Sequence, residues 1–117
     1  MSTIKVDNLQ TTTGTGLYLA KSWCTVYQVG TQVIRDSENV SSITDAGSGY
    51  TDVTMSNAQP NANYCISTYT AVLGGGGNQH HTCVSRNFTT TTTKYRLTCM
   101  SNTLQATDGL VGASIFS

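Results

Sequence analysis

The chain has few charges and no long apolar run. Only 10% of its 117 residues are charged, and six Lys plus Arg balance six Asp plus Glu. A chain without net charge has no general field to attract a polyanion, so we expect no nucleic-acid binding. No stretch approaches the roughly 20 apolar residues that cross a bilayer, and residues 1–5 lack the apolar core of a secretory signal. We therefore expect synthesis in a cytoplasm and no membrane insertion.

Motifs for metal binding and catalysis are also missing. Four cysteines occur singly, at Cys24, Cys65, Cys83 and Cys99, without the short paired spacings of zinc ligands. The six acidic residues read as turn or cap residues, so the facing carboxylates of a glycosidase are not predicted, and no nucleophile motif of a serine hydrolase is present. We predict no enzymatic activity, no cofactor and no metal site, and keep a carbohydrate-active enzyme only as a third alternative.

The sequence leaves the pairing of the cysteines open. A hairpin turn centred on Thr91 would put Cys83 opposite Cys99, whereas a turn centred on Gly74 would put Cys65 opposite Cys83. Both registers cannot yield disulfides at once. Buried thiols that act as small apolar side chains are the simplest interpretation for a protein made in a cytoplasm.

Short alternating apolar runs dominate the rest of the chain. Thr, Ser, Asn and Gly make up 52 of the 117 residues, and Val53 and Met55 alternate with polar Asp52 and Thr54. A period of two predicts strands, and turn-forming residues separate the runs at intervals of about ten. We predict strands at 17–27, 32–35, 40–44, 50–55, 64–72, 82–88, 94–101 and 110–116. This pattern favours an all-β fold, an antiparallel β-sandwich of about eight short strands, with a small barrel as the alternative.

The predicted core and the predicted domain boundary follow from the same pattern. Alternating burial predicts a core built on Trp23, Val53, Met55, Ile66, Leu97 and Ile115. Residues 1–16 differ from the rest because Ile4, Val6 and Leu9 are their only large apolar side chains and a Thr/Gly connector follows. We expect an extended N-terminal arm over 1–16, either frayed or docked on a neighbouring subunit, and a sandwich over 17–117.

Several short segments together resemble a known family. They are AKSW at 20–23, IRDSENVSSITD at 34–45, GYT at 49–51, PNANY at 60–64 and VGASIF at 111–116, with IKVD at 4–7 as the opening. This combination resembles the small tail-fibre-like virion structural proteins of bacteriophages, particularly phages of aquatic bacteria such as cyanophages. The resemblance covers roughly 21–117, and the chain departs from it at Cys24, at Tyr27 and in the loop 74–81.

The resemblance implies a non-enzymatic protein of the virion surface. A tail fibre or receptor-binding component is the expected role, and a capsid cement or decoration protein that stabilises the head lattice is the alternative. The resemblance also implies a homo-oligomer, which we expect to be a homotrimer. Its other expected partners are virion proteins of the tail or the major capsid protein, and a host surface receptor or glycan.

Two sets of residues are the predicted contact sites. A loop tip tolerates variation and often carries recognition, so the recognition loop is predicted at Gly74, Gly75, Gly76, Gly77, Asn78, Gln79, His80 and His81. Arginine and tyrosine are enriched in interfaces, which predicts subunit contacts at Arg35, Arg86, Tyr95 and Arg96. The alternatives are a solvated loop without a partner and single outward arginines on a solvated sheet.

Overall fold

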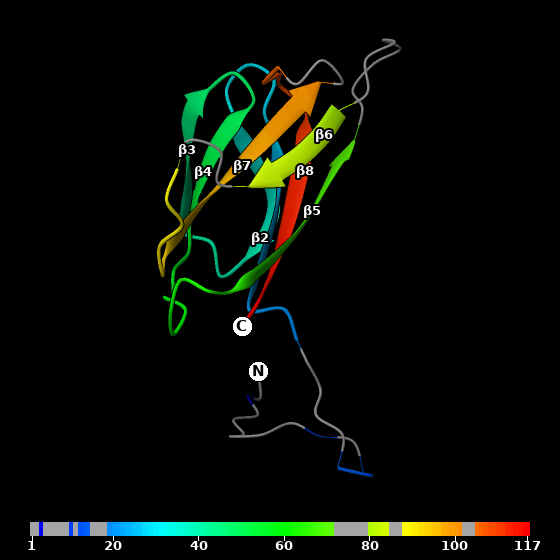
Figure 1. Cartoon of the computed structure of the whole chain (residues 1–117), viewed down its shortest axis with the longest axis vertical. Coiled ribbons are helices and arrows are strands. Elements are labelled where there is room, and N and C mark those ends of the chain that lie inside the picture. Colours follow the sequence, from blue (N-terminus) through cyan, green and yellow to red (C-terminus); the bar gives the residue numbers. More distant parts are fainter. Residues whose placement is uncertain are drawn as a thin grey trace.

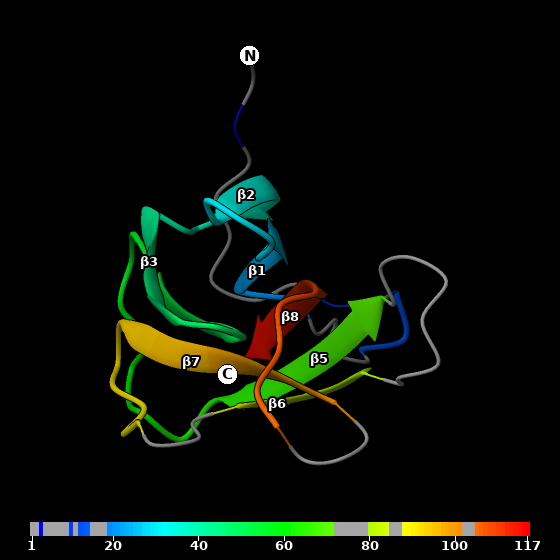
Figure 2. The same cartoon turned by 90° about the horizontal axis from the view of Figure 1, so that it is seen from above.

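Two four-stranded antiparallel sheets pack face to face in the computed structural model (Figures 1 and 2). The structure describes residues 3, 10, 12–14, 19–71, 80–84, 88–101 and 105–117. Within these residues eight strands are present and no helix. The predicted all-β sandwich of about eight short strands is confirmed.

Each sheet combines strands that are distant in the sequence. Sheet I has the order β2 (Val33–Glu38), β1 (Ser22–Tyr27), β8 (Leu110–Phe116) and β5 (Cys65–Ala71). Sheet II has the order β3 (Ser42–Gly47), β4 (Tyr50–Thr54), β7 (Lys94–Ser101) and β6 (His80–Val84). Strands adjacent in sequence pair within a sheet as β1 with β2, β3 with β4 and β6 with β7, and the other connections cross between the sheets.

The strand limits agree best with the sequence where alternation is cleanest. The predictions at 94–101 and 110–116 coincide with β7 and β8. The strand predicted from residue 17 begins only at Ser22, which pairs with Ile115 near the end of β8. Leu19 and Ala20 lie beyond the end of β8 and do not continue its ladder, although Lys21 N still donates to Ile115 O at 2.7 Å. The first two residues of the predicted strand, 17 and 18, lie outside the described residues.

The core lies between the sheets and is built from one face of each central strand. Val53, Met55, Leu97 and Ile115 are buried as predicted, while Ile66 is partly buried and packs against them. Full burial of such a side chain contributes roughly 1.5 to 3 kcal/mol. The remaining buried members are Cys24, Val26, Tyr64, Tyr95, Cys99, Val111 and Ala113.

The prediction that Trp23 belongs to the core is wrong. Strand β1 turns Ser22, Cys24 and Val26 toward sheet II, so Trp23 lies on the outer face of sheet I and is only half-buried. Adjacent residues of a strand point to opposite faces. The smaller side chains of Cys24 and Val26 face inward and belong to the buried cluster between the sheets.

The two ends of the sandwich are closed by polar networks. At the upper end in Figure 1, the buried amide of Gln28 donates to Gly49 O at 3.2 Å and to Thr51 Oγ1 at 2.8 Å, and it accepts from Gly109 N at 3.1 Å. At the lower end, Asn39 joins Lys21 O to Asn57 N. These bonds fix the connections between the sheets.

The observed strand pairing agrees with neither of the two cysteine alignments that the sequence suggests. Cys83 lies opposite Thr98, and Cys99 lies opposite Thr82, one residue away from the first alignment. The second alignment fails because β5 belongs to sheet I and β6 to sheet II. Cys24 is a buried free thiol as expected, but Cys65 is an exposed one.

Candidate functional site

The predicted recognition loop falls largely outside the described residues. Residues 72–79 are not described, and they include Gly74, Gly75, Gly76, Gly77, Asn78 and Gln79. The backbone of His80 begins β6 opposite Ser101, and His81 follows as an exposed residue opposite Met100. The described strands on either side, β5 and β6, end and begin at the upper end of the sandwich (Figure 1).

The predicted arm residues Ile4, Val6 and Leu9 also lie outside the described residues. The described segment 19–21 enters β1 at the lower end of the sandwich, where the chain also ends (Figure 1). Leu19 is exposed just before the sandwich begins. The described segment before β1 therefore lies at the end of the sandwich opposite to the one where β5 ends and β6 begins.

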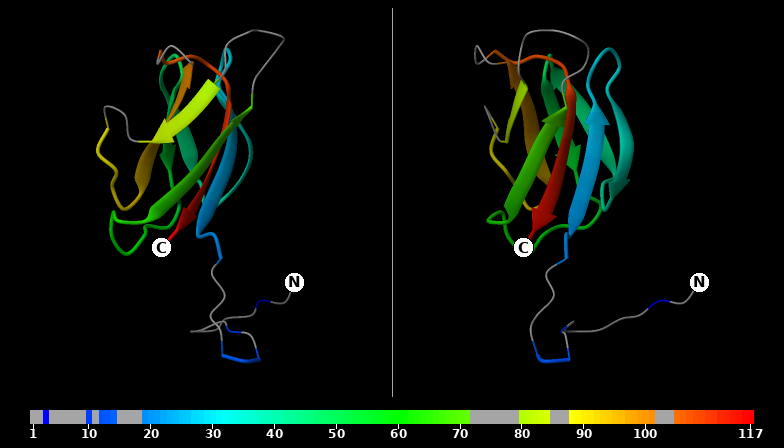
Figure 3. Two further views of the ribbon diagram at one scale, coloured as in Figure 1. Left: turned by 45° about the vertical axis from the view of Figure 1, so that its right-hand side comes forward. Right: turned by 90° about the vertical axis from the view of Figure 1, so that its right-hand side faces the viewer.

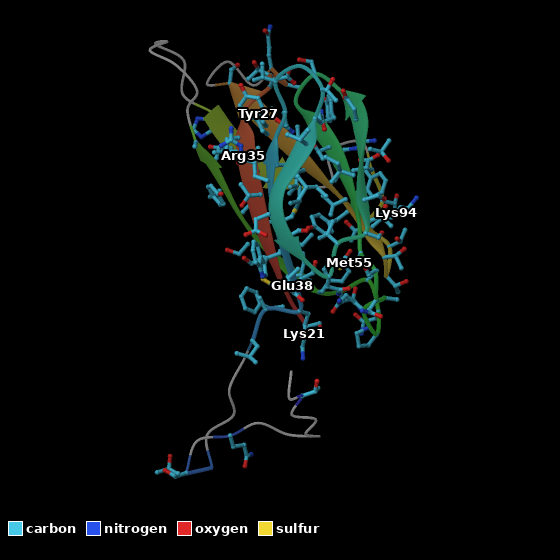
Figure 4. All side chains as sticks on the ribbon, turned by 180° about the vertical axis from the view of Figure 1, so that it is seen from behind. Lys21, Tyr27, Arg35, Glu38, Met55 and Lys94 are labelled. Atoms are coloured by element: carbon cyan, nitrogen blue, oxygen red, sulfur yellow. The ribbon has the colours of Figure 1, made fainter. Side chains whose placement is uncertain are left out.

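The four predicted interface residues do not form one surface. The guanidinium of Arg35 lies 4.9 Å from the centre of the Tyr27 ring, exposed on the outer side of sheet I (Figure 4). Arg96 lies on the outer side of sheet II, and Arg86 is outside the described residues. The placement of Tyr95 at an interface is wrong, because Tyr95 is fully buried in the core.

Arg96 is already engaged within the chain. Its Nε donates to Asp52 Oδ1 at 2.6 Å and its Nη2 donates to Asp52 Oδ2 at 3.1 Å. The same guanidinium lies 5.4 Å from the centre of the Tyr50 ring and 5.1 Å from that of Phe88. The hydrogen bond to Asp52 is the main cause that raises the pKa of Arg96; burial opposes it, and the charge interactions with Asp52 and Tyr50 add to the rise. The guanidinium therefore stays charged. Arg96 thus ties β4 to β7.

A different surface, the outer face of sheet I, carries exposed apolar side chains on three of its strands. Val33 of β2 is 47% exposed, Tyr69 of β5 is 50% exposed and Phe116 of β8 is 37% exposed. The half-buried Trp23 and Tyr27 of β1 point to the same side. The right-hand view of Figure 3 looks onto these four strands side by side. This face is the candidate functional site.

Tyr69 is held flat across this face. It lies directly opposite Gly112 of β8 in the register, and its ring occupies the space that a Cβ atom at Gly112 would need. Its hydroxyl reaches one strand further and makes a 3.2 Å hydrogen bond with Thr25 Oγ1 of β1. One side of the ring therefore rests on the sheet, and the exposed half of the residue faces solvent.

Polar side chains surround Tyr69 on the same face. The register places Ser67 opposite Ser114, and Ser114 opposite Trp23, in the row beside the ring. Across β1, Asp36 lies opposite Thr25 and Glu38 lies opposite Trp23, and both carboxylates are exposed. Figure 4 shows Glu38 near the lower end of the same sheet. The face thus combines aromatic rings with hydroxyl groups and hydrogen-bond acceptors.

The buried ionisable groups lie away from this face. Cys24 Sγ and the Tyr95 hydroxyl are 3.5 Å apart in the core. Burial raises the pKa of the Cys24 thiol, and the hydrogen bond to Tyr95 offsets this rise in part. Burial also raises the pKa of Tyr95, and the neighbouring thiol adds to the rise. Both groups stay protonated at neutral pH.

The described part of the chain has neither a metal-binding cluster nor a helix that could span a membrane. No group of three or more His, Cys, Asp or Glu residues there is placed to hold a metal ion. None of the described segments forms a helix long and apolar enough to span a membrane.

Sequence reasoning missed Tyr69 and Gly112. Their pairing depends on β5 and β8 being neighbours, which no local pattern reveals. The available signal was a single Gly inside the apolar run at 110–116, because a glycine within a strand often marks a close approach of another group.

The chain matches no protein-family model, no curated protein and no solved structure.

Proposed function

We propose that the chain is a bacteriophage virion structural protein, a tail fibre or receptor-binding component displayed on the particle surface. The sequence resemblance suggests this role, and the two-ended arrangement of the sandwich is the observation that carries it. The chain enters β1 at the lower end of the sandwich, where the C-terminus also lies, and β5 ends and β6 begins at the upper end (Figure 1). Such an arrangement suits attachment at one end and presentation at the other.

The surface chemistry supports display in many copies. The chain is neutral and rich in hydroxyl side chains, so its contacts would depend little on salt. The networks at both ends of the sandwich, centred on Gln28 and Asn39, hold the scaffold that would carry a recognition surface. A homotrimer is the proposed assembly, and analytical ultracentrifugation of the purified protein tests it.

Mass spectrometry of purified phage particles tests the proposal directly. The protein is expected among the particle proteins, and particles lacking it should remain intact but fail to adsorb to cells. Absence of the protein from particles that infect normally would contradict the proposed function.

Capsid cement is a second candidate, favoured by the broad apolar outer face of sheet I with Val33, Tyr69 and Phe116 exposed. A flat face of this kind suits docking along a protein lattice. Copy number distinguishes the two roles, because a lattice protein is present once per capsid subunit or per small group of subunits. Heads that burst under osmotic shock when the protein is missing would favour cement.

A further inference from the structure

We infer that the outer face of sheet I is a binding site for a neutral glycan, with the ring of Tyr69 as the platform on which one sugar ring stacks. The inference rests on the proposed function only for the source of the glycan, which would be a host surface. The site consists of strand residues of sheet I and does not include the loop at 74–81, the recognition loop that the sequence predicts. Its ligand class follows from the arrangement of rings, hydroxyls and carboxylates on the face.

The first step of the argument is the rigidity of the platform. The Tyr69 ring is fixed on one side by contact with Gly112 and at its tip by the hydrogen bond to Thr25. Its position therefore costs no further ordering when a ligand binds, and preorganisation of this kind favours affinity. The opposite side of the ring is open, since half of the residue is exposed.

The second step is the shape of the partner that fits. An open aromatic ring lying parallel to a sheet offers a flat apolar surface, not a pocket. The apolar C–H face of a pyranose is flat and matches it, and such a ring turns its hydroxyl groups outward toward neighbouring polar groups. Small ligands are generally held this way, by apolar contact plus a few placed polar groups.

The third step is the polar rim. Ser67 and Ser114 lie in the row next to Tyr69, and their hydroxyls both donate and accept hydrogen bonds. Asp36 and Glu38 add acceptors on the other side of β1. The exposed guanidinium of Arg35, which lies on Tyr27, offsets one of these charges, so this part of the face has no positive excess that would attract an anionic glycan. An uncharged glycan, whose hydroxyls donate to the carboxylates, fits it better.

A second copy of this chain is a poorer fit to the same face. If two copies docked face to face by a two-fold axis parallel to the strands and midway between β1 and β8, Asp36 and Glu38 of each would face β5 of the other. The outward residues of β5 carry no positive charge; they are Cys65, Ser67, Tyr69 and Ala71. Burial of carboxylates without a cationic partner is costly, whereas a sugar can hydrogen-bond to them.

The test uses the purified full chain and three probes, cellohexaose, mannohexaose and chitohexaose, each at about 10 mM, a concentration that reveals dissociation constants in the mM range. Saturation-transfer NMR and the shifts of the Tyr69 ring signals report binding. At least one probe is expected to receive saturation and to shift the Tyr69 ring. Failure of all three probes would overturn the inference.

Substitutions then separate stacking from a purely structural role. Tyr69→Leu still covers Gly112 but has no flat ring, and it is expected to weaken binding by about tenfold or more. Tyr69→Phe keeps the ring without its hydroxyl anchor and should retain most of the affinity. Val29→Ser is the matched control, because Val29 is an exposed apolar residue outside the four strands of this face.

Three further outcomes would overturn the inference. One is equal binding by Tyr69→Leu and the unchanged chain, and another is equal loss in Val29→Ser. The third is a shift of the Tyr69 signals with protein concentration, together with a dimer that Tyr69→Leu disperses, because a second copy would then occupy the face.

Failure of the inference and failure of the proposed function are distinguishable. Tyr69-dependent glycan binding by a protein absent from phage particles would leave the inference standing and remove the proposed function. If the protein is present in particles and needed for adsorption but binds none of the probes, the proposed function stands and the inference fails.

Discussion

Tyr69 and Gly112 depend on one another across the β5–β8 pair. A Cβ atom at position 112 would lie 2.7 Å from both Cδ1 and Cζ of the Tyr69 ring, closer than carbon atoms approach. An aromatic residue that covers a cross-strand glycine replaces the side-chain packing that the glycine lacks. The flat position of the ring therefore requires glycine at 112.

Gly112→Ala is expected to lift the Tyr69 ring from the sheet and to break its hydrogen bond with Thr25. We expect a loss of about 1 kcal/mol in the free energy of unfolding, the size of one hydrogen bond. In a Tyr69→Ala background the same substitution should become neutral or stabilise by about 0.4 to 1 kcal/mol, because alanine reduces the freedom of the unfolded chain. Urea denaturation of the double-mutant cycle measures this coupling. Additive effects would mean that the two residues do not interact.

Trp23 and Leu97 should differ sharply in their contribution to stability. Trp23→Ala removes a half-buried side chain from the outer face of sheet I, so we expect a cost of about 1 to 2 kcal/mol. Leu97→Ala opens a cavity between the sheets, since Leu97 is fully buried, and should cost about 2 to 5 kcal/mol. Thermal and urea unfolding of both variants give the comparison. A larger loss of stability for Trp23→Ala than for Leu97→Ala would contradict the placement of Trp23 outside the core.

Local alternation predicted the strands well where only one set of alternate residues is apolar. Residues 94–101 have one apolar set, Tyr95, Leu97 and Cys99, and the strand β7 matches its prediction. The same alternation already separated Tyr95 from Arg96, so the two could not both face outward. The interface prediction for Tyr95 failed because it weighed residue type above strand phase.

Where both sets of alternate residues contain apolar side chains, the sequence does not determine which set is buried. In β1 the choice lay between Trp23 with Tyr27 and Cys24 with Val26, and packing against the other sheet decided it. The Tyr69 platform depends on a pairing of strands distant in sequence. Such contacts arise from topology, which strand patterns alone leave open.

Stability should decline in alkaline solution because of Cys24 and Tyr95. Burial raises the pKa of Cys24 above its ordinary value of 9.0, and that of Tyr95 above 10.0. Above these ordinary values the unfolded chain releases protons that the folded chain retains. The stability contributed at lower pH is therefore lost as pH rises past 9 and then past 10, by up to about 1.4 kcal/mol per pH unit for each group.

Urea denaturation at about pH 8, 9.5 and 10.5 checks this pH dependence. Cys24→Ala is the control, because it removes the thiol but leaves Tyr95 in place. The variant should lose less stability than the unchanged chain over both intervals, because the Cys24 thiol of the unfolded chain is ionised from about pH 9 upward. The loss that the variant retains between the last two pH values comes from Tyr95. Identical slopes at every pH would show that the Cys24 thiol does not contribute.

Replacing the buried hydroxyl of Thr98 and that of Thr51 is expected to change the free energy of unfolding in opposite directions. Both residues are fully buried. Thr51 Oγ1 donates to Gln32 Oε1 at 2.6 Å and accepts from Gln28 Nε2 at 2.8 Å. Thr98 Oγ1 has no hydrogen-bond partner among the residues that the structure describes. A buried hydroxyl without a partner loses its hydration and gains nothing in return.

Thr98→Val should therefore raise the free energy of unfolding by about 1 kcal/mol, since valine fills the same space without a polar atom. Thr51→Val should lower it by about 1 to 3 kcal/mol, because the amides of Gln28 and Gln32 would each lose a partner. Urea denaturation of the two variants under one set of conditions gives the comparison. If Thr98→Val is as destabilising as Thr51→Val, the prediction is wrong and the Thr98 hydroxyl has a hydrogen-bond partner in the folded protein.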